Sequence, residues 1–159
     1  MSGTLVVYGI ILVIAVAGLL AAYRVLGTPS RLQPRDYELV LEDVVASVDR
    51  AAQRLKAAID SESDHSPKLE EEAREARKIF QTGYYQSLRL RPLSGPDLPA
   101  AARETLGQAC EAYDWASRMV ASESLGNPLI LEAAKGLMDR ADSYLKQARQ
   151  ALSVTAPPS

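Results

Sequence analysis

One run of the sequence places oxygen-bearing side chains at the spacing of a calcium-binding loop. Relative positions 1, 3, 5, 7 and 12, the ligand positions of an EF-hand, are held by Asp60, Glu62, Asp64, Ser66 and Glu71. The sixth position is His65 instead of the glycine that allows the sharp turn, and the ninth is the cation Lys68. Ser66 followed by Pro67 is more simply the cap and first residue of a helix. The pattern therefore predicts a helix start and no metal ion.

The remaining reactive side chains are too few for the usual catalytic constellations. The chain has one cysteine and one histidine, so neither an internal disulfide nor a zinc site of several Cys and His ligands can form. Cys110 stands next to Glu111 with no histidine nearby in the sequence, an environment that would not lower the thiol pKa. Met119 and Met138 are better interpreted as core filler than as haem ligands. We expect no catalytic residue, no cofactor and no small-molecule substrate.

The aromatic side chains include residues that lie off the expected apolar stripes. Tyr84 and Tyr85 come late in the second predicted helix, and Trp115 lies in the third, one turn before Arg118. Tyr, Trp and Arg are the residue types that most often anchor protein interfaces. We therefore predict a partner-binding surface that contains Tyr85, Trp115 and Arg118. The alternative is that Tyr85 and Trp115 only cover the margin of a narrow core.

Charge is unevenly distributed along the 159 residues. The 18 basic and 20 acidic side chains nearly cancel, to a net charge of -2. The chain therefore lacks the excess of positive charge that is typical of nucleic-acid-binding proteins. None of these charged side chains occurs before Arg24. The hydrophobic share of 47% and the charged share of 24% are typical of a globular chain. The sequence thus predicts an uncharged N-terminal segment and a globular body that binds no nucleic acid.

Residues 5–22 form an uncharged apolar run, LVVYGIILVIAVAGLLAA, that predicts a transmembrane helix. Eighteen residues at about 1.5 Å each cross most of a hydrocarbon core of roughly 30 Å, and the residues that follow complete the crossing. The alternative is a cleaved signal peptide, but the segment before the run has no Lys or Arg. We expect a retained anchor, with a short N-terminal tail, over residues 1–26.

Small residues are spaced along this predicted anchor so that a second membrane helix could approach it. Ala17 with Ala21, and Gly18 with Ala22, form two small-xxx-small pairs. Such pairs are also common by chance in transmembrane segments. These four residues are the candidate packing face of the anchor.

Positive charge on one side of the anchor predicts its orientation. Arg24, Arg31 and Arg35 follow the apolar run, whereas the N-terminal flank has no basic side chain. Lys and Arg are retained on the cytoplasmic side of membranes. We expect a single-pass protein, in a bacterial inner membrane, with a short N-terminus outside and a cytoplasmic C-terminal body.

Proline, glycine and polar residues divide the rest of the chain into four long segments. The expected helix starts are Asp36, Ser66–Pro67, Asp97 and Asn127–Pro128, each with a capping residue type. The connectors are too short to carry the chain back along a helix, so consecutive helices should be antiparallel. The sequence predicts a juxtamembrane linker at residues 27–35, an all-α up-down four-helix bundle at 36–152 and a C-terminal tail at 153–159.

Apolar residues recur at steps of three and four between the breaks, as on one side of a helix. The four stripes are Leu41, Val44, Val48, Ala51, Leu55 and Ala58; Leu69, Ala73, Ala76, Phe80 and Gly83 or Tyr84; Leu98, Ala102, Thr105, Ala109, Ala112, Ala116 and Met119; and Ile130, Ala134, Leu137, Ala141, Tyr144, Ala148 and Ala151. Stripes this rich in alanine favour close helix packing over a ligand cavity. The expected surface ion pairs are Glu70–Arg74, Asp114–Arg118 and Asp142–Lys146.

These features together predict a non-catalytic, single-pass, membrane-anchored helical subunit. It would bind or stabilise a larger membrane protein complex, or tether a partner at the membrane surface. The alternative is a membrane-anchored sensor or ligand-binding helical bundle, which requires a pocket large enough for a ligand. The layout of one transmembrane helix and a helical body resembles that of LemA-like membrane proteins in arrangement; the motif of that family is not present after the anchor, so no residue role is carried over.

Overall fold

The computed structural model describes residues 30–61, 66–92, 99–122 and 127–155. The chain divides into two compact units, Met1–Ser30 and Arg31–Ser159. Within the described ranges, no helix combines the length and the apolar character needed to cross a membrane. The predicted anchor at residues 1–26, with its four small packing residues, lies outside the described residues. The transmembrane helix therefore stays a prediction.

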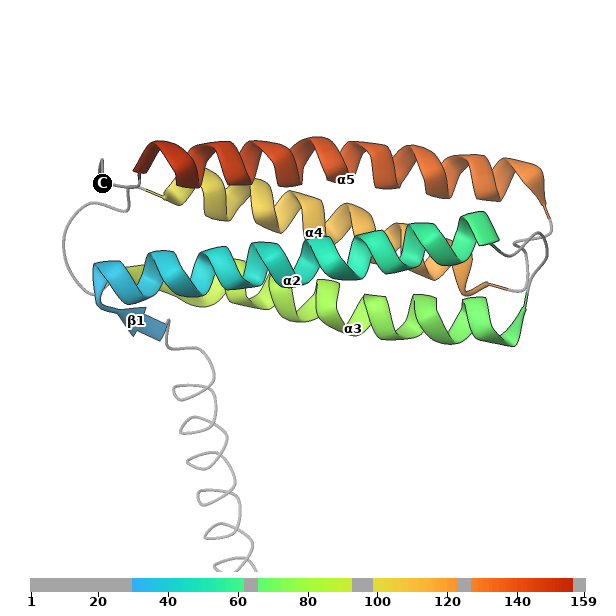
Figure 1. Cartoon of the computed structure of the whole chain (residues 1–159), viewed down its shortest axis with the longest axis horizontal. Helices are drawn as coiled ribbons and strands as arrows, with labels where there is room; N and C mark the ends of the chain where they lie inside the picture. The colour runs from blue at the N-terminus through green and yellow to red at the C-terminus, as the bar shows by residue number, and fades with distance from the viewer. Residues whose placement is uncertain (1–29, 62–65, 93–98, 123–126, 156–159) are drawn as a thin grey trace, which may run out of the picture. The chain divides into compact units, whose positions relative to one another are not determined.

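Four long helices make up nearly all of the described structure. They are α2 (Pro34–Ser61), α3 (Pro67–Arg89), α4 (Ala100–Val120) and α5 (Pro128–Thr155). Figure 1 shows the helices side by side, with each one running opposite to the helix before it. Each helix packs against its sequence neighbour, and the contact that closes the bundle, between α2 and α5, is much smaller. The prediction of a four-helix bundle is confirmed.

The helix starts follow the capping chemistry in two of the four cases. Ser66 accepts a hydrogen bond through Oγ from the backbone N–H of Leu69 at 3.1 Å, and Pro67 occupies the first turn of α3. Asn127 Oδ1 accepts a hydrogen bond from the N–H of Leu129 at 3.0 Å before α5. These two helix starts confirm the prediction from the sequence.

The other two helix starts differ from the expectation. Helix α2 begins at Pro34, two residues before Asp36, because proline is well suited to the first helical position. Helix α4 begins at Ala100, and Pro99 before it offers no side-chain cap. The predicted start at Asp97 lies outside the described residues. At the far end, α5 continues to Thr155.

Two three-residue strands, which the sequence analysis did not predict, pair with each other in the bundle. Strand β1 (Ser30–Leu32) directly precedes α2, and β2 (Leu90–Pro92) directly follows α3. Segments of three residues are too short to show an alternating pattern, which is why the sequence carried no strand signal. The pairing ties the start of α2 to the end of α3.

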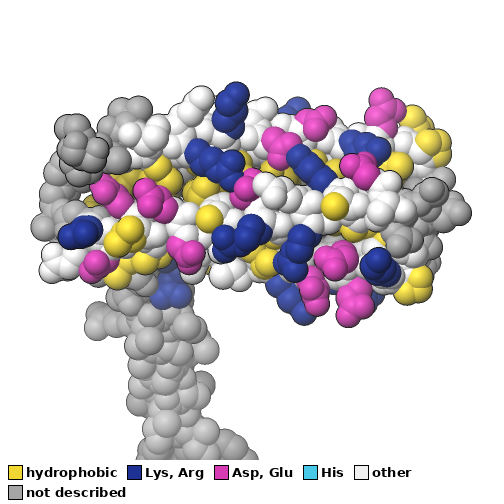
Figure 2. All heavy atoms as spheres, viewed as in Figure 1, with side chains coloured by type: hydrophobic (Ala, Val, Ile, Leu, Met, Phe, Trp, Pro, Cys, Tyr) yellow, Lys and Arg dark blue, Asp and Glu magenta, His cyan; other side chains and the backbone are white. Residues whose placement is uncertain are grey.

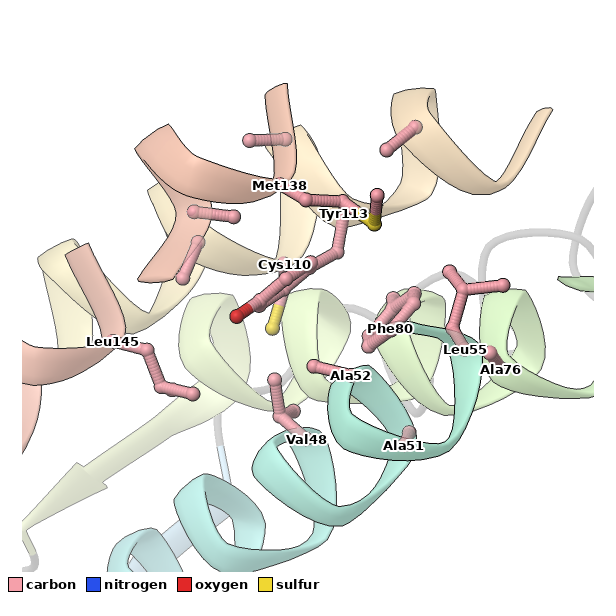
Figure 3. Close-up of a cluster of buried hydrophobic side chains, with 14 of the residues drawn as sticks. Val48, Ala51, Ala52, Leu55, Ala76, Phe80, Cys110, Tyr113, Met138 and Leu145 are labelled. Atoms are coloured by element: carbon pink, nitrogen blue, oxygen red, sulfur yellow. The ribbon is translucent and has the colours of Figure 1, made fainter. Parts of the chain in front are cut away.

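The core lies along the bundle axis and draws side chains from all four helices. Figure 3 shows Val48 and Leu55 of α2, Phe80 of α3, Tyr113 of α4 and Leu145 of α5 converging on one interior. The rings of Phe80 and Tyr113 are stacked, with centroids 4.8 Å apart and planes 18° from parallel. This aromatic pair joins α3 to α4 at the centre of the bundle.

Gly83 of α3 lies close to side chains of both α2 and α4. A Cβ atom at this position would lie 2.8 Å from Cys110 Sγ of α4 and 2.9 Å from Val48 Cγ2 of α2. Both distances are shorter than van der Waals contact allows, so a side chain here would push the helices apart. The residue type at position 83 therefore sets the spacing of α2, α3 and α4.

The buried stripes of α4 and α5 are wider than the sequence analysis expected. Besides the alanines, both helices bury larger side chains: Leu106, Cys110, Tyr113 and Val120 in α4, and Met138, Leu145 and Leu152 in α5. Met119, Leu137 and Tyr144, which were expected in the buried stripes, are only partly buried against the core. A helix that contacts two neighbours needs a broader apolar face than a single three-four rhythm describes.

Candidate functional site

Among the described residues, five large hydrophobic side chains are exposed, and three of them lie on α3 and α4. Tyr85 is 63% exposed, Leu88 51% and Trp115 50%, whereas the other two, Leu39 and Leu129, lie on α2 and α5. The α3–α4 face is defined here as Gln81, Tyr84, Tyr85 and Leu88 of α3 with Glu111, Asp114, Trp115 and Arg118 of α4. Exposed apolar residues that cluster in this way are typical of interaction sites.

A shallow groove of about 270 Å³ runs between the two helices on this face. Its lining includes Tyr85, Trp115 and Arg118, the three residues that the sequence predicted for a partner surface. The sequence left open whether these residues lie together, because the end of one antiparallel helix faces the start of the next. The structure brings all three to the same groove.

Trp115 and Arg118 form one rigid unit at the α4 wall of the groove. The guanidinium carbon of Arg118 lies 4.8 Å from the centroid of the Trp115 ring, a cation–π contact. Asp114 Oδ2 accepts hydrogen bonds from Arg118 Nε at 2.9 Å and Nη2 at 2.7 Å. Because the guanidinium is held from two sides, the arginine and the indole present a fixed surface with little entropy left to lose.

Asp114 also connects this unit to α3. Its Oδ1 accepts hydrogen bonds from Arg77 Nε and Gln81 Nε2, both at 3.1 Å. The Asp114 side chain is only 15% exposed, so these four bonds are partly shielded from water. The predicted Asp114–Arg118 pair is confirmed, and it belongs to a network that fixes the register of α3 against α4.

The tyrosine pair forms the opposite wall. The rings of Tyr84 and Tyr85 meet edge to face with centroids 6.1 Å apart. Leu88 lies one helical turn beyond Tyr84, which extends the apolar surface toward the end of α3. The groove therefore has an aromatic wall on each helix.

Cys110 lies beneath the groove and is inert. Its side chain is fully buried, and burial raises the pKa of the thiol to about 12. At neutral pH the group is therefore an uncharged thiol, which is neither a nucleophile nor a metal ligand. The expectation of an unreactive cysteine agrees with this environment.

The face between α2 and α5 has a different character. Figure 2 shows basic and acidic side chains intermingled over it, with small hydrophobic patches. Asp49 of α2 pairs with Arg149 of α5 at 2.6 Å, and Lys56 of α2 pairs with Asp142 of α5. Two ion pairs thus bridge the helices on this face.

Asp142 corrects one prediction from the sequence. The expected partner was Lys146, one turn along the same helix, but the carboxylate instead accepts hydrogen bonds from Lys56 and from the Tyr113 hydroxyl. Burial, and then the bond to Asp142, raise the pKa of the Tyr113 phenol well above its usual range. The carboxylate points inward because Tyr113, otherwise buried in the core, needs an acceptor.

The described residues contain no group of three or more His, Cys, Asp or Glu side chains that could hold a metal ion. Of the calcium-like run, residues 62–65 lie outside the described ranges. Ser66, the seventh position of that run, directs its hydroxyl to the α3 backbone as a cap. This cap is the simpler role that the sequence already indicated.

Sequence reasoning missed three members of the α3–α4 face, Gln81, Leu88 and Glu111, and it missed the bonds from Asp114 to α3. Gln81 and Leu88 carry no distinguishing local signal, because their place on the face depends on the register of two helices. Asp114 was recognised through its spacing to Arg118, but its link to Arg77 crosses between helices.

No protein-family model matches the chain, and neither the curated proteins nor the solved structures include one with significant similarity.

Proposed function

We propose that this chain is a non-catalytic, single-pass, membrane-anchored helical subunit that binds a protein partner through the α3–α4 face. The observation that carries the proposal is that Tyr85 and Trp115, both exposed, line one groove, with Leu88 exposed further along α3. Burying such side chains contributes about 1.5–3 kcal/mol each, so leaving three of them in water is costly unless a partner covers them.

The arrangement of the face supports protein binding over chemistry. Asp114 holds Arg118 over the Trp115 ring, and pre-organised aromatic and arginine side chains are typical of interface hot spots. The Cys110 thiol beneath the groove is protonated at neutral pH, so it supplies no nucleophile. The predicted anchor at residues 1–26 would hold this face at a membrane, where a subunit of a larger complex would meet it.

Site-specific photo-crosslinking in bacterial cells tests the proposal. A photoreactive phenylalanine analogue would replace Tyr85 or Trp115 in the full chain, and Leu129, which is 71% exposed on α5, in a matched control. We expect discrete crosslinked adducts in the membrane fraction from positions 85 and 115 and none from 129. Adducts that are equally frequent at all three positions, or absent from 85 and 115, would contradict the proposal.

Membrane anchoring and orientation need a separate test. We expect the full chain to resist carbonate extraction from membranes, and its body to survive protease added to sealed right-side-out cells. Replacing Arg24, Arg31 and Arg35 with glutamine, while adding lysines to the N-terminal tail, should reverse the orientation of part of the molecules. Degradation of the native body in intact cells would show that the body lies outside.

The second candidate function is a ligand-binding or sensor bundle. A groove of about 360 Å³ between α2 and α3, lined in part by Val40, Val44 and Ile79, favours it because ligand pockets of about 300–1,000 Å³ are usual. The groove is open to solvent, which makes it less suited to enclose a small molecule. A rise of the thermal midpoint with a metabolite panel would support this candidate, and Val44→Trp, which fills the groove, should abolish the rise.

A further inference from the structure

The outer surface of α4 carries a charge pattern that is complementary to itself. Glu111, Trp115 and Arg118 are all exposed and follow one another at steps of four and three residues, about one helical turn each. The tryptophan is thus flanked by a carboxylate on one side and a guanidinium on the other, at similar distances along the helix axis. Reversing the helix direction exchanges the two charges.

We propose that the α3–α4 face pairs two copies of this chain, with α4 packed antiparallel to α4 of the second copy about Trp115. A two-fold axis at Trp115 places Arg118 of each copy opposite Glu111 of the other, so one contact generates two identical ion pairs. A parallel arrangement would set Glu111 against Glu111 and Arg118 against Arg118. The charges therefore specify the antiparallel orientation.

This inference rests on the proposed function, because it names the partner of the same face.

Glu111 and Arg118 both have capacity for a further ion pair. Glu111 makes no ion pair with any residue that the structure describes, so it is available to a second copy. Arg118 uses Nε and Nη2 on Asp114, and a guanidinium has further N–H donors that can reach a second carboxylate.

The apolar residues of the face fit the same geometry. Trp115 would lie at the axis against its counterpart, and Tyr85, on the Glu111 side of the groove, would flank the incoming Arg118. The central tryptophan, already fixed by the cation–π contact, is the hot spot of this interface.

Charge reversal with rescue tests the inference on the full chain in mild detergent. Sedimentation equilibrium measures the dimer dissociation constant of the unaltered chain, E111R, R118E and the double variant. Each single reversal should raise the constant at least about tenfold, and the double variant should restore it to within about threefold. Trp115→Ala should also raise the dimer dissociation constant at least about tenfold. This variant keeps the Arg118–Asp114 bonds, so it tests the interface even if R118E, which loses them, is destabilised.

Matched controls carry the same changes on another face. Glu132→Arg and Leu129→Ala alter exposed residues of α5 and should leave the dissociation constant unchanged. Circular dichroism checks that each variant keeps its helix content. A dimer that resists all three α4 variants, such as one held through Ala17 and Gly18, overturns the inference, as does a double variant that is weaker than either single reversal.

The oligomeric state also separates this inference from the proposed function. A chain that remains monomeric, yet still crosslinks to a different protein from positions 85 and 115, overturns the second copy as partner and leaves the proposed function standing. A monomeric chain with no adduct at either position overturns both. Crosslinked dimers from positions 85 and 115, lost in E111R and regained in the double variant, support both.

Discussion

The contact between α3 and α4 and the contact between α2 and α5 occupy opposite sides of the bundle and are built differently. Inside the bundle, α3 and α4 are joined by the stacked rings of Phe80 and Tyr113, while aromatic side chains remain exposed on the outside. Helices α2 and α5 touch far less, and ion pairs bridge them. Both contacts leave a groove of similar size, about 270 and 340 Å³.

The difference shows that a groove by itself does not identify a site. The α2–α5 groove is lined by Asp49 and Arg149, which neutralise each other within the chain. The α3–α4 groove leaves apolar rings and the Glu111 carboxylate without such a partner among the described residues. For this reason the proposed partner surface is the α3–α4 groove.

The largest effect on stability should come from the inner side of the α3–α4 contact. Phe80→Ala removes a fully buried ring and its stacking contact with Tyr113. This loss should lower the free energy of unfolding by about 3–5 kcal/mol. Urea unfolding of the full chain in detergent, followed by helix content, measures the change. Leu88→Ala, one of the exposed residues of the same helix, is the control and should cost far less. A loss below that of the control would show that the aromatic pair does not hold the two helices together.

Asp142 should be the most important residue of the α2–α5 contact. Asp142→Ala leaves the buried Tyr113 hydroxyl without its acceptor and Lys56 without its anion, at a cost of about 1–3 kcal/mol. Asp49→Ala breaks the ion pair with Arg149 but leaves no buried hydroxyl without an acceptor, so it should cost about 0–1 kcal/mol. The same urea experiment compares the two variants. Equal losses would mean that the Tyr113 bond adds nothing to the ion pair.

These two contacts also show how far sequence reasoning reaches. Helix number, the cap at Ser66 and the packing role of Phe80 follow from local spacing, because each depends on residues within a few turns. The bond from Tyr113 to Asp142 joins residues on different helices, so no local pattern could predict it. The same holds for the meeting of Tyr85 with Trp115, which depends on the register of α3 against α4.

The spacing of the alanines also predicted the large buried residues of α5 one position too early in the sequence. Leu137 and Tyr144 fit the three-four rhythm, but Met138 and Leu145 are the residues that enter the core. Small residues mark where helices come close, whereas larger neighbours on the same side fill the space beside them. A stripe read from the alanines alone is therefore too narrow.

The buried thiol beneath the α3–α4 groove predicts a loss of stability in alkali. An unfolded thiol ionises near pH 8.5, whereas the native Cys110 thiol has a pKa of about 12, so between these values the unfolded state binds fewer protons. Stability should then fall as pH rises, by up to about 1.4 kcal/mol per pH unit from this group. Tyr113, whose pKa is also raised, adds to the fall above about pH 10.

Urea unfolding at several pH values between 8 and 10 tests this expectation. Cys110→Ala should flatten the decline in this range, because the group that ionises is gone. The native thiol should also resist alkylation at pH 8 until the chain unfolds. A decline of equal slope in the variant would assign the alkaline loss to other groups.

The smallest effect on stability should come from the outer side of the α3–α4 contact, where the proposed binding effect is largest. Trp115 is half exposed, so Trp115→Ala removes little buried area and should change the free energy of unfolding by about 0.5 kcal/mol or less. Arg118 loses its cation–π contact in this variant but keeps both hydrogen bonds to Asp114, which preserves the register of the helices. Urea unfolding and photo-crosslinking from position 85, performed on the same variant, separate the two roles. Full stability with loss of the adduct is the expected result. A loss of more than about 2 kcal/mol would instead make Trp115 a margin of the core, and the contrast between the two sides of this helix pair would disappear.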